Sequence, residues 1–238
     1  MVVSNILIAA ILSLCLSVIA PTVTGQQSVE RPPEMQRLYD ATALLYAQDG
    51  SGTMTTLCTA TIVKKVESGY YLLTASHCVA DEEKPGEEAR RKVYLSFDDN
   101  PDDNRFLRVH VVVLGDGSKG QDYAILRVKT DRDLPVIPLG RSNTLQGRQR
   151  ICAVAGSAGL GKTEVDGYVT MPMIDRPLIS KSGHVDWTSD ILLDLLISPA
   201  ASGSLVYSID QHAAIGIAVG MYAQRHTVAL PINRVIIP

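Results

Sequence analysis

The sequence predicts an all-β protein, either a barrel or a sandwich, from three observations. Short apolar runs rich in β-branched residues recur from residue 41 onward, and Gly, Asp, Asn or Pro interrupts them at close intervals. Such runs are typical of strands joined by tight turns. Beyond the first 25 residues, long helical periodicity is hard to find. The length of 238 residues fits one compact unit, since barrels and sandwiches often reach this size as one domain.

The predicted strands follow one another along the chain. They are residues 59–63, 70–75, 93–97, 108–114, 123–128, 151–155, 167–170, 192–197, 204–208, 214–219 and 227–230. Residues 81–92 are charged throughout and contain Pro-Gly, which predicts a solvated loop. Residues 135–140, with two prolines and a glycine, are the best connector between two halves, residues 26–134 and 135–238. Residues 26–40 are predicted as either a propeptide or a strand that wraps the fold.

The N-terminus has the features of a secretory signal peptide. An apolar run over residues 6–20 is followed by small residues. This run is shorter than the ~20 residues that a membrane-spanning helix needs. We predict a leader over residues 1–25 that is removed before Gln26, and a secreted or periplasmic product without a stable membrane span. The alternative is an uncleaved anchor, because Val2 and Val3 extend the apolar run.

Charge and histidine spacing argue against two classes of partner. The chain has 22 basic and 25 acidic residues, a net charge of -3, and no long run of either sign. Nucleic-acid binding usually requires a basic patch, so we predict no nucleic-acid partner. His110, His184 and His212 lack the spacing with cysteines or carboxylates that is typical of zinc sites, and we predict no metal and no cofactor.

The cysteines predict one disulfide in an exported protein. Of the four cysteines, Cys15 lies in the predicted leader, which leaves Cys58, Cys78 and Cys152. Disulfides persist in oxidising compartments. One bridge and one buried free thiol is therefore the simplest arrangement, although counting alone does not choose the pair.

Three residues at the ends of predicted strands suggest nucleophilic catalysis. A serine hydroxyl is a poor nucleophile until an imidazole takes its proton and a carboxylate orients that imidazole. His77 directly follows an apolar strand, Asp122 directly precedes one, and Ser202 lies in a turn of small residues that leads into another. These three residues are the candidate catalytic group.

Motifs around these residues resemble those of trypsin-like serine peptidases. Residues 74–78 (Thr-Ala-Ser-His-Cys) resemble the histidine motif, residues 122–126 (Asp-Tyr-Ala-Ile-Leu) the aspartate motif, and residues 202–204 (Ser-Gly-Ser) the nucleophile turn. The second half is similar to the bacterial HtrA-type (Do-like) branch, both in its glycine-rich segment 156–170 and in its approach to the serine at 194–203.

The resemblance implies two antiparallel six-stranded Greek-key β-barrels of the chymotrypsin type, with the catalytic groups between them. By that resemblance His77 is the general base, Asp122 orients it, and Ser202 attacks the peptide carbonyl to form an acyl-enzyme. The backbone N–H groups of Ala200 and Ser202 form the oxyanion hole. The implied function is that of a serine endopeptidase without a cofactor.

The resemblance also assigns the disulfide and the substrate pocket. Cys58 and Cys78 correspond to a bridge found in trypsin-like enzymes and generally absent from HtrA-type ones. Leu196, Gly216 and Val228 are the expected substrate-binding residues. Their apolar character predicts small or aliphatic side chains at the cleavage site of protein or peptide substrates.

The chain departs from the family pattern next to the nucleophile. Ala200 stands where the family usually has glycine, because the backbone there is strained. An alanine still provides the N–H group, but its Cβ raises the question of whether that N–H points at the oxyanion. A catalytically inactive relative that uses the same cleft for binding is therefore the alternative function.

A second, remote alternative comes from residues 156–163. Their letters, Gly-Ser-Ala-Gly-Leu-Gly-Lys-Thr, match the phosphate-binding P-loop pattern. A P-loop requires a helix after its Lys-Thr pair, which aims the helix N-terminus at the phosphates. The residues that follow include Gly167 and Pro172 and predict a strand, so a turn between strands is the favoured interpretation.

Overall fold

The computed structural model describes residues 31–81, 86–89, 92–99, 105–157, 160–175 and 190–238. The predicted leader, residues 1–25, and His184 lie outside the described residues. Within the described ranges, no helix has both the length and the apolar character needed to cross a bilayer.

The described chain begins with a short helix that the sequence did not predict. Helix α1 (Pro33–Ala41) starts with a proline, whose missing N–H costs nothing in a first turn. Met35, Leu38 and Tyr39 are spaced as on one helix face and pack against the apolar cluster that fills the first barrel and includes Cys152 and Val154 of the second. The expectation of a strand over residues 26–40 is therefore wrong for residues 33–40, and residues 26–30 lie outside the described residues.

Six strands close into the first barrel. They are β1 (Thr42–Gln48), β2 (Met54–Val66), β3 (Gly69–Thr74), β4 (Val93–Ser96), β5 (Leu107–Leu114) and β6 (Ala124–Val128). Their order around the barrel is β1-β2-β3-β6-β5-β4, and each neighbouring pair is antiparallel. The return of β4 to the side of β1 is the arrangement of a Greek key.

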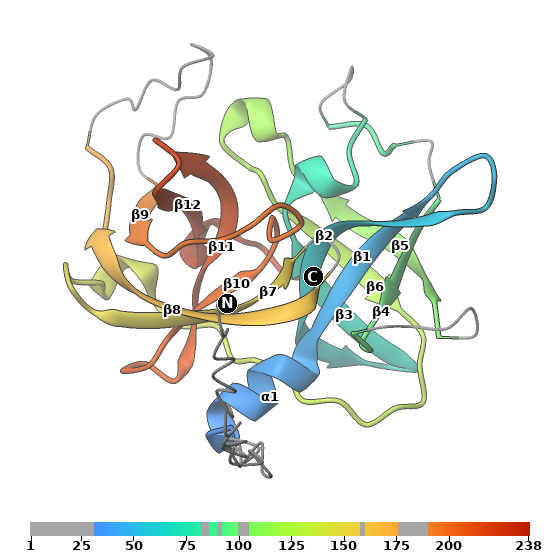
Figure 1. Cartoon of the computed structure of the whole chain (residues 1–238), viewed down its shortest axis with the longest axis horizontal. Helices are drawn as coiled ribbons and strands as arrows, with labels where there is room; N and C mark the ends of the chain where they lie inside the picture. The colour runs from blue at the N-terminus through green and yellow to red at the C-terminus, as the bar shows by residue number, and fades with distance from the viewer. Residues whose placement is uncertain (1–30, 82–85, 90–91, 100–104, 158–159, 176–189) are drawn as a thin grey trace, which may run out of the picture. The chain divides into compact units, whose positions relative to one another are not determined.

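The second barrel repeats this order. Its strands are β7 (Arg150–Ser157), β8 (Gly161–Met171), β9 (Ile191–Asp194), β10 (Leu205–Ser208), β11 (Ala213–Tyr222) and β12 (His226–Pro231). Here β10 returns beside β7, and the closed order is β10-β11-β12-β9-β8-β7. Two six-stranded antiparallel barrels confirm the predicted fold class, and Figure 1 shows them in blue to green and in yellow to red.

Strand β7 lies where the two barrels pack together. Ile151, Ala153 and Ala155 belong to the apolar cluster inside the second barrel. Cys152 and Val154, the residues between them, belong to the cluster that also fills the first barrel. Because both faces are buried, this strand is apolar from Ile151 to Ala155 instead of alternating with polar residues.

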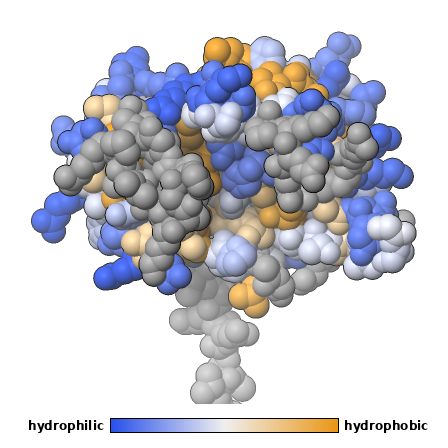
Figure 2. Space-filling view, turned by 90° about the horizontal axis from the view of Figure 1, so that it is seen from above, coloured by the Kyte–Doolittle hydropathy of each residue, from blue (hydrophilic) through white to orange (hydrophobic). Residues whose placement is uncertain are grey.

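The passage between the barrels includes the predicted connector. The N–H of Ile137 donates to Ile62 O in the first barrel, and the N–H of Gly140 donates to Ala214 O in the second. Residues 135–140 therefore contact both barrels. The face shown in Figure 2 has hydrophilic residues over much of its described part, with apolar residues in separate groups among them.

Candidate active site

Two strand ends in the first barrel bring His77 and Asp122 together. His77 lies in the 3₁₀ turn η1 (Ser76–Cys78), which follows β3 directly. Asp122 lies just before β6. Strands β3 and β6 are antiparallel neighbours, with Thr74 opposite Ala124, so the end of one strand lies beside the start of the other.

The Asp122 carboxylate receives three hydrogen bonds from the histidine turn. Its Oδ2 lies 2.7 Å from His77 Nδ1. Its Oδ1 accepts from the backbone N–H of His77 at 3.1 Å and from the hydroxyl of Ser76 at 2.8 Å. These contacts fix both the position of the imidazole and its tautomer, in which Nδ1 carries the proton and Nε2 is the free base.

The same contacts set the protonation state of the carboxylate. Burial by itself raises the pKa of Asp122, but the hydrogen bonds and charge of His77 and the hydroxyl of Ser76 outweigh it, and the pKa lies below its usual value. Asp122 is therefore ionised at neutral pH. The side chain of His77 is 45% exposed and remains accessible to a bound molecule.

Ser202 lies in a tight turn that leads into β10. The turn is closed by the N–H of Ser204, which donates to Ala201 O at 3.0 Å, and Gly203 within it has a φ of 86°. A Cβ at Gly203 would stand 2.2 Å from Thr74 Oγ1 and 2.3 Å from Thr59 O. Only glycine fits this close approach to the first barrel.

Further contacts hold the Ser202 turn against the first barrel. The backbone N–H of Thr59 donates to Ser202 O at 2.9 Å. A disulfide joins Cys58 to Cys78 with a Cα–Cα distance of 6.0 Å, and the Cys78 sulfur lies 3.8 Å from Ser202 O. This bridge is the pair that the family resemblance implies.

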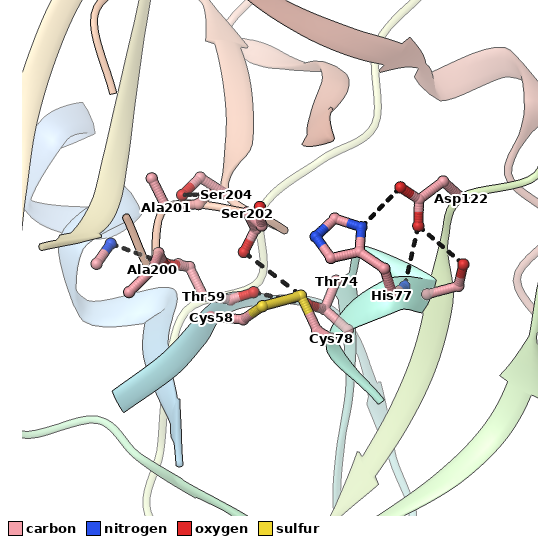
Figure 3. Close-up of a disulfide and its surroundings, with 12 residues drawn as sticks. Cys58, Thr59, Thr74, His77, Cys78, Asp122, Ala200, Ala201, Ser202 and Ser204 are labelled. Carbon is pink, nitrogen blue, oxygen red and sulfur yellow. Dashed lines mark hydrogen bonds and ion pairs between the residues drawn. A yellow bond between two sulfur atoms is a disulfide. The ribbon is translucent and has the colours of Figure 1, made fainter. Parts of the chain in front are cut away.

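In Figure 3 the imidazole of His77 lies between Asp122 and Ser202. Ser202 is half-buried. Within the described part of the chain, its hydroxyl makes no hydrogen bond, to His77 or to any other group. In an enzyme without substrate, the bond between nucleophile and base is often long and tightens only when substrate binds.

Ala200 adopts the backbone conformation that a glycine would take. Its φ is 76°, in the left-handed region, which costs an L-residue about 1–2 kcal/mol. Among the described residues, neither the N–H of Ala200 nor that of Ser202 donates a hydrogen bond. Two amides without an acceptor therefore lie on either side of Ala201, and an oxyanion site requires such a pair.

The three expected substrate-binding residues do not share a surface. The side chain of Leu196 is 68% exposed. Gly216 lies within β11 and is paired with Val206 on one side and Pro231 on the other, while Val228 is fully buried in an apolar cluster with Leu192. Of the three, only Leu196 presents a side chain to solvent.

A pocket next to His77 was not predicted. Its volume is about 390 Å³, and its lining residues all belong to turns and loops of the first barrel. Its lining residues are Ser76, His77, Ala80, Asp81, Gly86, Gly117, Ser118 and Asp122. The pocket therefore adjoins both the imidazole of His77 and the carboxylate of Asp122.

The sequence did not indicate two polar residues at the site. Ser76 supports Asp122, and Thr59 Oγ1 contacts both the N–H of Gly156, at 2.7 Å, and Ala200 O, at 2.8 Å. Ser76 directly precedes His77, so the sequence alone could have indicated that it lies near the site. Thr59 shows no pattern in the sequence, because its partners lie about 100 and 140 residues further along the chain.

The P-loop alternative is wrong for residues 161–171, which form strand β8 instead of a helix. Lys162 is 8% exposed, and its Nζ donates to the backbone carbonyls of Tyr39, Thr42 and Phe97 at 3.1, 3.2 and 2.9 Å. Burial lowers the pKa of this amine. Its hydrogen bonds are used within the fold, so it is not available to a phosphate group.

Three potential metal ligands meet at Cys58, His77 and Cys78, whose ligand atoms lie within 4.8 Å of one another. The two sulfurs are bonded to each other and offer no thiolate. Cys152 is buried, and burial raises the pKa of its thiol to about 12, which makes it an unreactive core residue.

The family described as "Trypsin-like peptidase domain" matches residues 58–217, more than half of the chain. The chain belongs to the trypsin-like peptidase family. The matched segment contains His77, Asp122 and Ser202. A search of curated protein sequences gives no match.

Solved structures confirm the chymotrypsin type of fold for this trypsin-like peptidase. "HtrA-type protease AlgW with decapeptide" is 21% identical, with a TM-score of 0.63, over 83% of this chain and 62% of the other. "HtrA-type protease AlgW with tripeptide" is 22% identical, with a TM-score of 0.62, over 83% and 58%. This chain therefore spans about three fifths of the length of these proteins.

Proposed function

We propose that the chain is a serine endopeptidase that uses His77, Asp122 and Ser202 and passes through an acyl-enzyme. One observation carries the proposal. His77 Nδ1 lies 2.7 Å from Asp122 Oδ2 in the first barrel, and Thr59 of the same barrel holds the Ser202 turn through its backbone N–H. A carboxylate kept ionised beside an oriented imidazole is the arrangement that activates a serine hydroxyl.

The chemistry follows from these positions. His77 Nε2 takes the proton of Ser202 as Oγ attacks the peptide carbonyl, and the Asp122 carboxylate stabilises the imidazolium that forms. The N–H groups of Ala200 and Ser202 bind the oxyanion. The imidazolium then gives its proton to the leaving amine, which leaves an ester on Ser202. Water, deprotonated by the same imidazole, hydrolyses this ester and restores the enzyme.

We propose peptides as substrates of this site. The matched HtrA-type structures are described with a decapeptide and a tripeptide. In this chain, the pocket beside His77 has room for a side chain next to the reacting bond. The proposed mechanism requires no cofactor.

We also propose that the protein acts after export, in the periplasm or outside the cell. The apolar run over residues 6–20 supports a cleaved leader. The bridge between Cys58 and Cys78 supports an oxidising compartment, because cytosolic thiols are normally kept reduced.

Active-site labelling tests this function. We expect a fluorophosphonate probe to label the wild-type protein and to leave Ser202→Ala unlabelled, with the modified residue identified by mass spectrometry. Labelling that persists in Ser202→Ala would disprove the assigned nucleophile. If the folded wild-type protein is not labelled at all, the second candidate function applies, in which the cleft only binds peptides. The strained backbone of Ala200 is the observation that keeps this second candidate open.

A further inference from the structure

The hydroxyl of Thr59 connects the first barrel to both segments that surround the proposed oxyanion site. Thr59 follows Cys58 in β2 and is fully buried. Its Oγ1 accepts a hydrogen bond from the N–H of Gly156 at 2.7 Å and donates one to Ala200 O at 2.8 Å. One hydroxyl therefore uses both its acceptor and its donor capacity on backbone groups of the second barrel.

At Gly156 the hydroxyl replaces a strand partner that is missing on the β10 side, whereas Lys162 of β8 pairs with Gly156 on the other side. Strand β10 pairs with β7 only from Ile151 to Ala153, so its ladder ends before Gly156. A buried N–H group at this position requires another acceptor. Thr59 Oγ1 supplies it. A Cβ at Gly156 would stand 2.8 Å from both Thr59 Oγ1 and Ala200 O, which shows how closely strand, hydroxyl and turn pack.

At Ala200 the hydroxyl holds a turn that alanine does not favour. The N–H of Ala201 donates to Ser198 O at 3.1 Å, which places Pro199 and Ala200 at the two central positions. The φ of 76° at Ala200 belongs to a type II turn, which favours glycine at that position. A type I turn keeps the same closing hydrogen bond and suits alanine, but its central peptide is reversed. That reversal turns the N–H of Ala200 away from the oxyanion.

Contacts at both ends of the turn favour the observed conformation. At its start, the hydroxyl of Ser198 lies 2.8 Å from that of Ser157. At its end, Thr59 holds the carbonyl of Ala200. The two turn types twist the chain differently, so fixing both the entering and the leaving segment selects one of them.

We propose that Thr59 is a positioning residue for catalysis: its hydroxyl keeps the Ala200 amide directed at the oxyanion, in the absence of the glycine that the family pattern places there. This inference rests on the proposed function. Thr59 lies outside the triad, in the first barrel, and its side chain sets the geometry of the Ala200 amide in the second barrel. Thr59 itself touches no reacting atom.

Three variants test the role of the hydroxyl. Thr59→Val keeps the shape and removes the hydroxyl, Thr59→Ser keeps the hydroxyl, and Thr61→Val is the matched control. Thr61 is also fully buried in β2, and its hydroxyl faces that of Thr42 instead of Ala200. We expect Thr59→Val to lower the maximal rate of fluorophosphonate labelling about 10- to 100-fold, with the probe's binding constant little changed. Thr59→Ser and Thr61→Val should stay within about threefold of wild type.

Ala200→Gly tests the mechanism by which the hydroxyl acts. Glycine adopts a positive φ without strain, so the turn no longer needs Thr59 to hold it. We expect Ala200→Gly to raise the labelling rate at least about tenfold more in the Thr59→Val background than in the wild-type background. A purely structural role for Thr59 predicts no such rescue. If Thr59→Val does not fold, the same comparison is made with Thr59→Ala.

The outcomes separate this inference from the proposed function. If the wild-type protein is not labelled at Ser202, the proposed function fails first. If the wild type is labelled, two results overturn the inference alone. These are a labelling rate of folded Thr59→Val equal to that of Thr61→Val, or a deficit in Thr59→Val that Ala200→Gly leaves unchanged.

Discussion

Removal of the Cys58–Cys78 bridge gives a stability change that follows from the length of the closed loop. The two cysteines are separated by 20 residues. For a loop of this length, the chain-entropy relation assigns about 3 kcal/mol to the cross-link at 25 °C. We therefore expect the variant with both cysteines changed to alanine to lose about 3 kcal/mol of unfolding free energy. Because a domain of this size shifts by about 2–4 °C per kcal/mol, Tm should fall by about 6–12 °C.

The assay is urea unfolding of the double variant, followed by circular dichroism and compared with wild type and with Cys152→Ala. Cys152 is a free, buried cysteine, so its variant controls for the loss of a sulfur atom without the loss of a bridge. Reductant should lower the stability of the wild type and of Cys152→Ala and leave the double variant unchanged. A loss below about 1 kcal/mol at an unchanged denaturant slope would refute the loop-entropy argument.

Three further substitutions have defined outcomes. Asp122→Asn should lower the maximal labelling rate about 10⁴-fold, because the amide no longer fixes the tautomer of the base; a rate near wild type would exclude this carboxylate from the triad. The lowered pKa of Asp122 stabilises the fold above about pH 4, and this contribution is lost as pH falls further, so acid unfolding curves of wild type and Asp122→Asn should converge at low pH. Lys162→Met should cost about 2–4 kcal/mol in urea unfolding, since three carbonyls lose a charged donor, and an unchanged midpoint would contradict this. Gly203→Ala should cost more than about 3 kcal/mol and abolish labelling, because its Cβ would overlap Thr74 and its φ is 86°; a stable, labelled variant would show that the turn relaxes.

The sequence predicted features that depend on local pattern. The apolar strands are recognisable because a β-branched run bounded by turn residues has few other stable conformations in a folded core. His77 and Asp122 were found because each adjoins such a run. The family resemblance implied that His77 and Asp122 lie close together. Their juxtaposition depends on the pairing of β3 with β6, which no spacing in the sequence could derive.

The features that escaped prediction depend on contacts between distant segments. Lys162 carries the letters of a phosphate-binding loop, yet one of its partners is the carbonyl of Thr42, 120 residues earlier in the chain. Helix α1 is only nine residues long and is stabilised by packing on the first barrel. The placement of Gly216 within β11 is set by two neighbouring strands, and its role in substrate binding stays a prediction. In each case a partner elsewhere in the chain decides what the residue does.

The division of the candidate residues between the barrels has a consequence for fragments of the chain. His77 and Asp122 lie in the first barrel, and Ser202 lies in the turn before β10 of the second. A truncated chain that ends before β10 therefore contains the imidazole and its carboxylate but lacks the hydroxyl. By the proposed mechanism, neither barrel alone hydrolyses a peptide, so activity requires that both are folded and docked.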